Sequence, residues 1–382
     1  MKLLHTSDWH VGKVLKGRSR LDEHVAVLNQ VVEIARAERP DLVIVAGDLY
    51  DSAAPHPDAT KLVTRALSAL RATGAAVVAI GGNHDNGRAL DALRPWAEAA
   101  GITLRGAVRE NPDEHVIEGV TAGGERWRLV ALPFLSHRYA VRAVEMYALS
   151  AAEATQTYAD HVARLLTRLT ARFTEPDVIN LITAHLTVVG GRTGGGEREA
   201  QVLTYAVPAS VFPTSAHYVA LGHLHRAQTV IGPCPIRYSG SPLSVDFGEE
   251  DNQPSVTLVE LAATRAARVR DIPITAARPL RTVRGTLEEL AALPPSEAWL
   301  RVYVREAPRA GLRERVQDLL PNALDVRIDP EMIPESGPAR RRTPRSGRSP
   351  RELFADYLAQ HGHADDGVRE LFDVLYEEVT SS

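Results

Sequence analysis

The sequence is poor in cysteine and in long apolar runs, and each shortage narrows the classes of protein it can belong to. Its single cysteine, Cys234, excludes an intrachain disulfide and any cysteine-based zinc site. No apolar run approaches the roughly 18 residues of a membrane span, and the chain opens on a strand pattern rather than a cationic, apolar leader. These features predict a cytoplasmic protein with no membrane segment.

A strong positive charge is also missing. The 44 Lys and Arg residues are outnumbered by 48 Asp and Glu residues, which gives a formal net charge of −4. The chain as a whole therefore does not attract a polyanion. If the protein binds nucleic acid, local basic patches or metal ions must hold it.

Short β-branched runs alternate with amphipathic helices over the first half of the chain, a pattern typical of a layered α/β fold. The 382 residues are enough for two or more domains. Further helices are expected over 141–173, and a flexible glycine loop over 187–199. The predicted strands lie at 3–7, 42–46, 76–80, 116–120, 127–133, 177–185 and 217–223.

One predicted helix, over 21–39, has apolar residues on two faces. The second face could pack on another subunit, or the helix could be buried between a sheet and its neighbours in the same chain. The two stripes are Leu21, Val25, Leu28, Val32 and Ala35, and Val27, Val31 and Ile34.

The last third of the chain changes character. After a first domain over 1–275, a strand-helix-strand-helix-strand pattern predicts a small α/β capping domain over 276–333. A Pro, Gly, Ser and Arg-rich linker over 334–350 follows, and then a helical hairpin over 351–382. The hairpin could bind a partner protein or dock back on the cap, and the linker arginines could contact phosphates or be merely solvated.

Five predicted strands are followed by Asp, Asn or His residues, whose side chains commonly bind metal ions. Five of the 14 histidines stand at these ends, and burying them beside carboxylates would be costly without a cation. Residues two apart on an extended segment face the same side, so the pairs Asp8 with His10 and His223 with His225 are expected to converge. The candidate ligands are Asp8, His10, Asp48, Asn83, His185, His223 and His225.

Seven such ligands are too many for one tetrahedral zinc and suit two octahedral ions with a bridging carboxylate. Carboxylate, amide and imidazole donors without thiolate favour Mn²⁺, Fe or Zn over Mg²⁺. The sequence therefore predicts a dimetal centre at the carboxyl ends of the strands.

The motifs "DWH", "GDLYD", "GNHD", "AH" and "GHLH", in this order, resemble the calcineurin-type metallophosphoesterase superfamily. Within it, "MKLLHTSDWHVGK", "YSGSPLSVDFGEE" and the cap resemble the bacterial SbcD family of DNA-repair nucleases. The resemblance implies an α/β fold: a layered β-sandwich flanked by helices, with a small α/β capping domain and a C-terminal helical hairpin.

The resemblance also implies roles for single residues. Asp8, His10 and His225 would hold the first metal, and Asn83, His185 and His223 the second, with Asp48 bridging both. His84 would contact the scissile phosphate and assist departure of the 3′ oxygen, and Asp85 would orient His84. Asp51 departs from archaeal and eukaryotic relatives, which often carry a histidine there.

The resemblance implies Mn²⁺-dependent 3′–5′ exonuclease activity and hairpin endonuclease activity on DNA. It also implies an SMC-type ATPase partner, SbcC, and a homodimer formed through 21–39 and 61–71. The hairpin residues expected on the ATPase are Leu353, Phe354, Tyr357, Leu371, Phe372 and Leu375. Two other readings stay open: a phosphatase or small-molecule phosphodiesterase with the same ligands, and a non-catalytic scaffold that recruits an ATPase.

Overall fold

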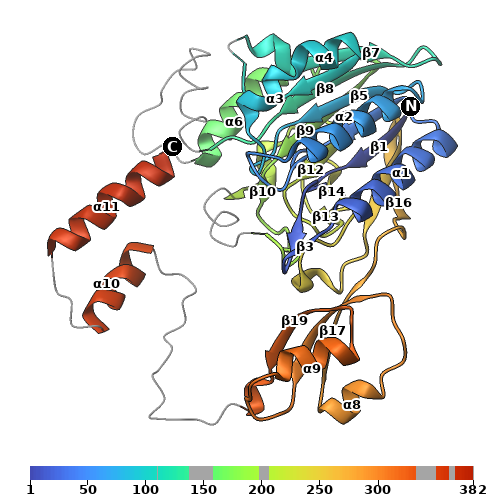
Figure 1. Ribbon diagram of the computed structural model, residues 1–382. Coiled ribbons are helices and arrows are strands. Elements are labelled where there is room, and N and C mark those ends of the chain that lie inside the picture. The colour runs from blue at the N-terminus through green and yellow to red at the C-terminus, as the bar shows by residue number, and fades with distance from the viewer. Residues whose placement is uncertain (110, 137–157, 198–205, 333–349, 361–365, 382) are drawn as a thin grey trace. The chain divides into compact units, whose positions relative to one another are not determined.

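The computed structural model describes residues 1–109, 111–136, 158–197, 206–332, 350–360 and 366–381 (Figure 1). By their contacts they form two compact units, Met1–Asp329 and Pro330–Ser382. The expected helix within 141–157 and the arginine-rich linker at 334–349 lie outside the described residues.

Two six-stranded sheets form the body of the first unit. The first has the order β16-β15-β1-β4-β5-β6, in which β1, β4, β5 and β6 run parallel. The second has the order β13-β14-β12-β9-β8-β7, in which β14, β12, β9 and β8 run parallel. The strands are β1 (Lys2–Thr6), β4 (Leu42–Val45), β5 (Ala76–Ile80), β6 (Ile102–Arg105), β7 (Val116–Val120), β8 (Arg126–Leu132), β9 (Val178–His185), β12 (Tyr218–Gly222), β13 (Gln228–Val230), β14 (Ile236–Tyr238), β15 (Ser255–Ala262) and β16 (Arg265–Pro273).

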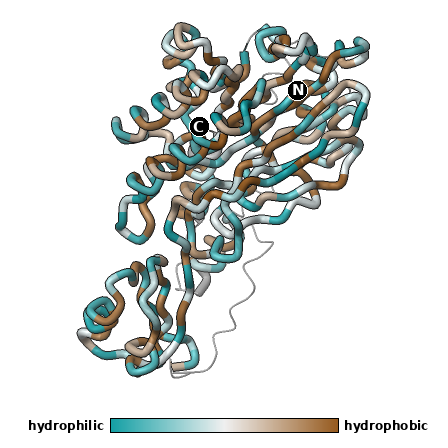
Figure 2. Tube along the Cα trace, turned by 90° about the vertical axis from the view of Figure 1, so that its right-hand side faces the viewer, coloured by the Kyte–Doolittle hydropathy of each residue, from teal (hydrophilic) through white to brown (hydrophobic). Residues whose placement is uncertain are grey.

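The two sheets pack face to face, and helices cover their outer faces (Figure 1). Apolar residues of β1, β4 and β5 meet those of β8, β9 and β12 in a shared core, visible as hydrophobic runs along the strands in Figure 2. The helices are α1 (Leu21–Glu38), α2 (Pro57–Arg71), α3 (Gly87–Ala92) and α4 (Arg94–Ala99) on the first sheet, and α6 (Tyr158–Leu169) on the second. This arrangement confirms the predicted layered β-sandwich flanked by helices.

Both apolar stripes of α1 face the chain's own interior. Val27, Val31 and Val32 are buried, and Ile34 packs against the same core. Only Val25 among the stripe residues is exposed, at 41%. The second stripe is therefore explained by burial within the chain, the plainer of the two sequence readings, and gives no support for a contact with another subunit.

A three-stranded parallel sheet, β17-β18-β19, begins after residue 276 and carries two helices on one face. Its elements alternate as the sequence predicts. An apolar cluster of Leu15, Phe247, Leu280 and Trp299 joins this sheet to the sandwich, so it belongs to the first compact unit. The elements are β17 (Leu280–Gly285), α8 (Leu287–Ala291), β18 (Trp299–Val304), α9 (Leu312–Leu319) and β19 (Ala323–Ile328).

The second unit contains the hairpin of α10 (Pro350–Gln360) and α11 (Asp366–Ser381). Phe354 stacks on Phe372, with ring centroids 4.1 Å apart, and this contact joins the two helices. Tyr357, Leu371 and Leu375 are exposed at 54%, 58% and 49%. Of the six residues expected on the partner, Phe354 and Phe372 thus contact each other, these three are exposed, and Leu353 is partly buried.

Short elements complete the described chain: β2 (Val14–Leu15), β3 (Arg18–Ser19), β10 (Thr187–Val188), β11 (Ala206–Val207), η1 (Pro112–His115), η2 (Ala209–Val211), η3 (Phe247–Glu249) and η4 (Pro330–Met332). Within the described ranges, no helix has both the length and the apolar character needed to cross a bilayer.

Candidate dimetal centre

The predicted ligands lie at the carboxyl ends of parallel strands from both sheets. β1, β4 and β5 of the first sheet deliver Asp8, His10, Asp48 and Asn83, and β9 and β12 of the second deliver the three remaining histidines. Both sheets present these ends at one place, as expected for open α/β architectures. Six of the seven side chains are at most 5% exposed: Asp8, His10, Asp48, His185, His223 and His225.

The backbone conformation that brings these side chains together could not be predicted from the sequence. Asp8, His10, Asp48 and His223 have φ of 53°, 46°, 51° and 100°, in the left-handed region that residues other than glycine rarely adopt. The pairs Asp8 with His10 and His223 with His225 therefore do not converge by alternation along an extended segment, and that explanation was wrong. Tight turns at the strand ends aim these side chains, and strained backbone of this kind clusters at functional sites.

Asp8, His10 and His225 form the first ligand group. One donor atom from each lies within 4.8 Å of the others, and His10 Nε2 is 3.0 Å from His225 Nε2. The Ser7 hydroxyl donates to Asp8 Oδ2 at 2.6 Å, and the backbone N–H of His223 donates to Asp8 Oδ1 at 3.0 Å. The Asp8 carboxylate is thus held at a fixed orientation.

Asn83, His185 and His223 form the second group. Asn83 Oδ1 lies 2.9 Å from His185 Nε2 and 2.8 Å from His223 Nδ1. Asp48 stands between the groups, because its Oδ2 is 3.4 Å from His185 Nε2 and 3.6 Å from His10 Nε2. This is the geometry expected of a bridging carboxylate.

The donor atoms fit divalent cations. Nδ1 of His185 lies 2.8 Å from the carbonyl oxygen of Ala46, which can only accept, so Nδ1 carries the proton of a neutral ring. The lone pair on Nε2 then faces the oxygens of Asn83 and Asp48. A lone pair buried against two acceptors requires a proton or a cation between them.

The charge balance points the same way. Burial opposes protonation of His185, but Asp48 outweighs it and raises the pKa of His185 to about 9. Burial likewise opposes protonation of His225, yet Glu249 raises the pKa of that imidazole to about 10. Burial alone would raise the pKa of Asp48, but the histidines around it hold that pKa well below its usual range. Burial instead lowers the pKa of His10 well below its usual range and that of His223 to about 3. The carboxylates thus favour positive charge at His185 and His225, which bound cations would provide in place of these protons.

His84 lies beside the ligands, and one of its ring nitrogens is within 4.8 Å of donor atoms of His10 and Asp48. Its Nδ1 donates to the backbone oxygen of Asp51 at 2.9 Å, and its ring meets that of His10 edge-on at 4.7 Å. Asp85 accepts from the backbone N–H groups of Leu49 (3.1 Å), Tyr50 (2.9 Å) and Gly82 (2.9 Å). The Asp51 carbonyl thus holds His84, and Asp85 fixes the loop that carries Asp48; the orientation of His84 by Asp85 stays a prediction.

Two acidic residues at the site were not predicted from the sequence. Glu249 Oε1 lies 2.6 Å from Nδ1 of His225, and Glu197 Oε1 accepts from the His225 backbone N–H at 2.7 Å. Glu249 falls within the motif "YSGSPLSVDFGEE", and Glu197 follows the triple glycine of the predicted glycine loop. Nothing in those stretches distinguishes a buried acid from an exposed one.

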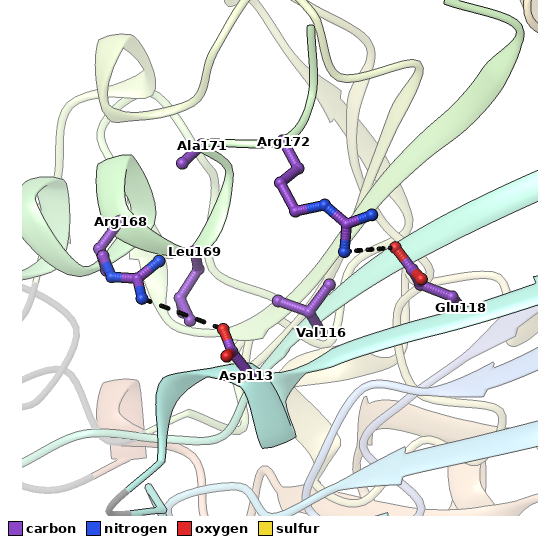
Figure 3. Close-up of a pocket in the computed structure, with 7 residues that line it drawn as sticks. All are labelled: Asp113, Val116, Glu118, Arg168, Leu169, Ala171 and Arg172. Carbon is purple, nitrogen blue, oxygen red and sulfur yellow. Dashed lines mark ion pairs between the residues drawn. The ribbon is translucent and has the colours of Figure 1, made fainter. Parts of the chain in front are cut away.

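A separate hollow lies between β7 and α6 (Figure 3). Its charged side chains pair with one another: Arg172 with Glu118 at 3.1 Å, and Arg168 with Asp113 at 4.0 Å. It contains none of the predicted ligands, so the histidine-rich cluster remains the candidate site.

Two family models match parts of the chain. Residues 1–147 match the calcineurin-like phosphoesterase family, and residues 276–362 match the family described as type 5 capsule protein repressor C-terminal domain. The first match contains Asp8, His10, Asp48, Asn83, His84 and Asp85 of the predicted site. Fold and site together define the class of the protein as a calcineurin-like metallophosphoesterase.

Curated relatives narrow this class to one family. The SbcD subunit of nuclease SbcCD from Bacillus subtilis is 34% identical over 86% of this chain and 85% of its own length. The same protein of Rhodobacter capsulatus is 36% identical over 81% of this chain and 78% of its own, and that of Escherichia coli K12 is 32% identical over 76% and 73%. The chain belongs to the SbcD family of nuclease SbcCD subunits.

Proposed function

We propose that this chain is the nuclease subunit of an SbcC–SbcD complex and hydrolyses DNA phosphodiester bonds with two divalent ions, most suitably Mn²⁺. The observation that carries the proposal is the arrangement of two ligand groups around one carboxylate: Asp48 Oδ2 lies 3.4 Å from His185 of one group and 3.6 Å from His10 of the other. The mixed oxygen and nitrogen donors favour Mn²⁺ over Mg²⁺.

The residues of the chain would divide the chemistry between them. Bound ions supply Lewis-acid polarisation of the phosphate and a lowered pKa of water. His84 is engaged through Nδ1 with the Asp51 carbonyl, so its Nε2 is the nitrogen that would face the scissile phosphate and protonate the departing 3′ oxygen. Asp85 would keep Asp48 in position, because its carboxylate accepts from the backbone N–H groups of Tyr50 and Gly82.

Features outside the metal centre favour DNA over a small phosphoester. The guanidinium of Arg284 lies over the Tyr303 ring, 4.3 Å from its centroid, and the side chains of Arg284 and Arg327 are 50% and 45% exposed. Each also pairs with an acid, Arg284 with Asp329 at 3.6 Å and Arg327 with Asp325 at 2.9 Å. Exposed arginines beside an aromatic ring suit contact with a phosphate backbone and unstacked bases.

We further propose the roles of the remaining parts. Residues 1–275 would be the nuclease domain, 276–333 the DNA-capping domain, 334–350 the linker and 351–382 the hairpin on the ATPase. The outward Tyr357, Leu371 and Leu375 support an apolar partner surface. A homodimer through the helices over 21–39 and 61–71 and a cytoplasmic location complete the proposal.

Hydrolysis assays on three substrates test the function. Purified full-length chain with Mn²⁺ should degrade double-stranded and hairpin DNA and cleave a chromogenic phosphodiester, with all three activities lost on chelation. Turnover of phosphomonoesters alone would support a phosphatase. Two bound ions with no turnover, together with tight binding of SbcC, would support a scaffold.

A further inference from the structure

The short helix η3 contacts the metal centre and the cap at the same time. At its end, Glu249 is 1% exposed, and its Oε1 lies 2.6 Å from Nδ1 of His225. At its start, Phe247 is also 1% exposed and packs with Leu280 and Trp299 of the cap. One turn of chain therefore separates a contact with a predicted metal ligand from a contact with another substructure.

Both carboxylate oxygens of Glu249 have defined partners. Oε1 faces His225, and Oε2 accepts from the backbone N–H of Val245 at 2.8 Å. A carboxylate on Nδ1 keeps the proton on that nitrogen and leaves Nε2 with its lone pair, 3.0 Å from Nε2 of His10 in the first ligand group. Such a partner fixes the tautomer and ring orientation of a ligating histidine and increases its basicity.

The glycine loop closes over this contact. A β-carbon at Gly196 would lie 1.9 Å from Glu249 Oε1, and one at Gly195, where φ is +108°, would lie 2.4 Å from the Gly248 oxygen. Backbone without side chains thus packs directly on η3. The same loop carries Glu197, which holds the His225 backbone N–H at 2.7 Å.

The cap holds η3 from the other side. The Arg301 guanidinium lies over the Phe247 ring, 4.7 Å from its centroid, and forms an ion pair with Asp246 at 3.9 Å. Trp299 donates through Nε1 to Glu23 at 3.1 Å, which anchors the cap on α1. A displacement of the cap would therefore act on η3 before it acted on any metal ligand.

We propose that Glu249 is a positioning residue for His225, and that the cap keeps Glu249 in place through Phe247. This inference rests on the proposed function only in taking His225 as a metal ligand. It links the first ligand group to the cap through one short helix, η3.

Metal titration of the full-length chain tests the proposal apart from catalysis. Isothermal titration with Mn²⁺ should show two ions on the unmodified chain, and Glu249→Gln should bind one of them about 10-fold to 100-fold more weakly. Glu250→Gln is the matched control, because Glu250 is the exposed neighbour of Glu249, and it should bind both ions normally. Normal binding by Glu249→Gln with a lowered melting temperature would overturn the proposal, because Glu249 would then only stabilise the fold.

A second variant tests the link to the cap and covers a Glu249 variant that fails to fold. Phe247→Leu leaves the carboxylate in place but loosens its contact with Leu280 and Trp299, and should weaken the same ion in the same direction. Unchanged affinity in Phe247→Leu would refute the role of the cap. If the unmodified chain binds two ions but does not cut DNA, the proposed substrate is wrong. The titration of the Glu249→Gln variant still tests the role of Glu249 in that case.

Discussion

The Asp48 carboxylate lies between the two ligand groups, so its removal should affect both ions. Asp48→Ala removes the carboxylate 3.4 Å from His185 and 3.6 Å from His10. We expect the variant to bind fewer than two Mn²⁺ per chain, measured by elemental analysis after desalting. A variant that retains two ions would rule out Asp48 as the bridge.

His84 should behave in the opposite way, because its side chain lies beside the ligands without belonging to either group. Its backbone N–H, which donates to Asp48 Oδ1 at 2.8 Å, survives the change to alanine. His84→Ala should therefore keep two ions but lower kcat on the chromogenic phosphodiester by about 10²-fold to 10⁴-fold, the usual contribution of an acid–base group. His56→Ala, at an exposed helix start, is the control, and an undiminished rate in His84→Ala would contradict the assignment.

His115 predicts a pH dependence of stability that does not involve the metal centre. Its Nδ1 donates to the Ala131 carbonyl at 2.8 Å, and its Nε2 accepts from the Arg109 backbone N–H at 2.8 Å, so the folded state holds it neutral. Burial lowers its pKa from 6.5 to about 4. The unfolded chain therefore binds the proton first as pH falls. The stabilisation is complete above pH 6.5 and is lost as pH falls toward 4.

The corresponding change in the free energy of unfolding is at most about 3 kcal/mol, the value of a shift of this size. Urea unfolding of the unmodified chain and of His115→Gln measures it, compared at about pH 7, above this transition, and at about pH 4.5, close to its lower end. The difference between the two proteins should shrink at the lower pH. A difference independent of pH would show that His115 is protonated in both states or in neither.

At the scale of single residues, the ligands could be predicted from the sequence, but the way they are aimed could not. Strand patterns ended at Asp8, Asp48 and His185, and residue type alone identified the chemistry. The left-handed backbone at Asp8 and Asp48 has no sequence signal, because residues other than glycine seldom adopt it. Glu249 and Glu250 are the same residue side by side, and only tertiary packing buries the first and exposes the second.

At the scale of elements, periodicity identified α1 but could not decide what covers its second stripe. The outer face of the first sheet and α2 together bury Val27 and Val31. A helix pressed between a sheet and a neighbouring helix needs apolar residues on more than one side, as an interface helix also does. The strands of the sandwich were easier to predict, since buried parallel strands are continuous apolar runs between turn residues.

The proposed homodimer can still be tested on α1, because Val25 is the apolar stripe residue that points outward. We expect the unmodified chain to have twice the 41.6 kDa of one chain by light scattering, and Val25→Glu to have the mass of one. Val269→Glu, at another exposed apolar position, controls for a surface charge. A single-chain mass for the unmodified protein at micromolar concentration would contradict dimerisation.

At the scale of the whole molecule, the two compact units differ in what stabilises them. The unit over Met1–Asp329 contains the sandwich cores and the cap, whereas the described part of the hairpin unit is joined by stacked aromatic rings and leaves Leu371, Val374 and Leu375 about half exposed. Apolar side chains clustered on one exposed helix face are typical of a surface that a groove or a second helix pair covers. The amphipathic pattern of this helix was visible in the sequence, but a pattern cannot identify its partner.

Substitution on that face should separate assembly from catalysis. Leu371→Glu combined with Leu375→Glu places two charges where an apolar partner surface would bury two leucines, and should weaken binding to SbcC at least about 10-fold by titration. Hydrolysis of the chromogenic phosphodiester and the content of two ions should not change, because both substitutions lie outside the unit that contains the metal ligands. Ile231→Glu, which changes a fully exposed apolar residue of the first unit, is the matched control and should bind SbcC normally. Full affinity in the double variant would place the ATPase contact elsewhere and leave the exposed face of α11 to another partner.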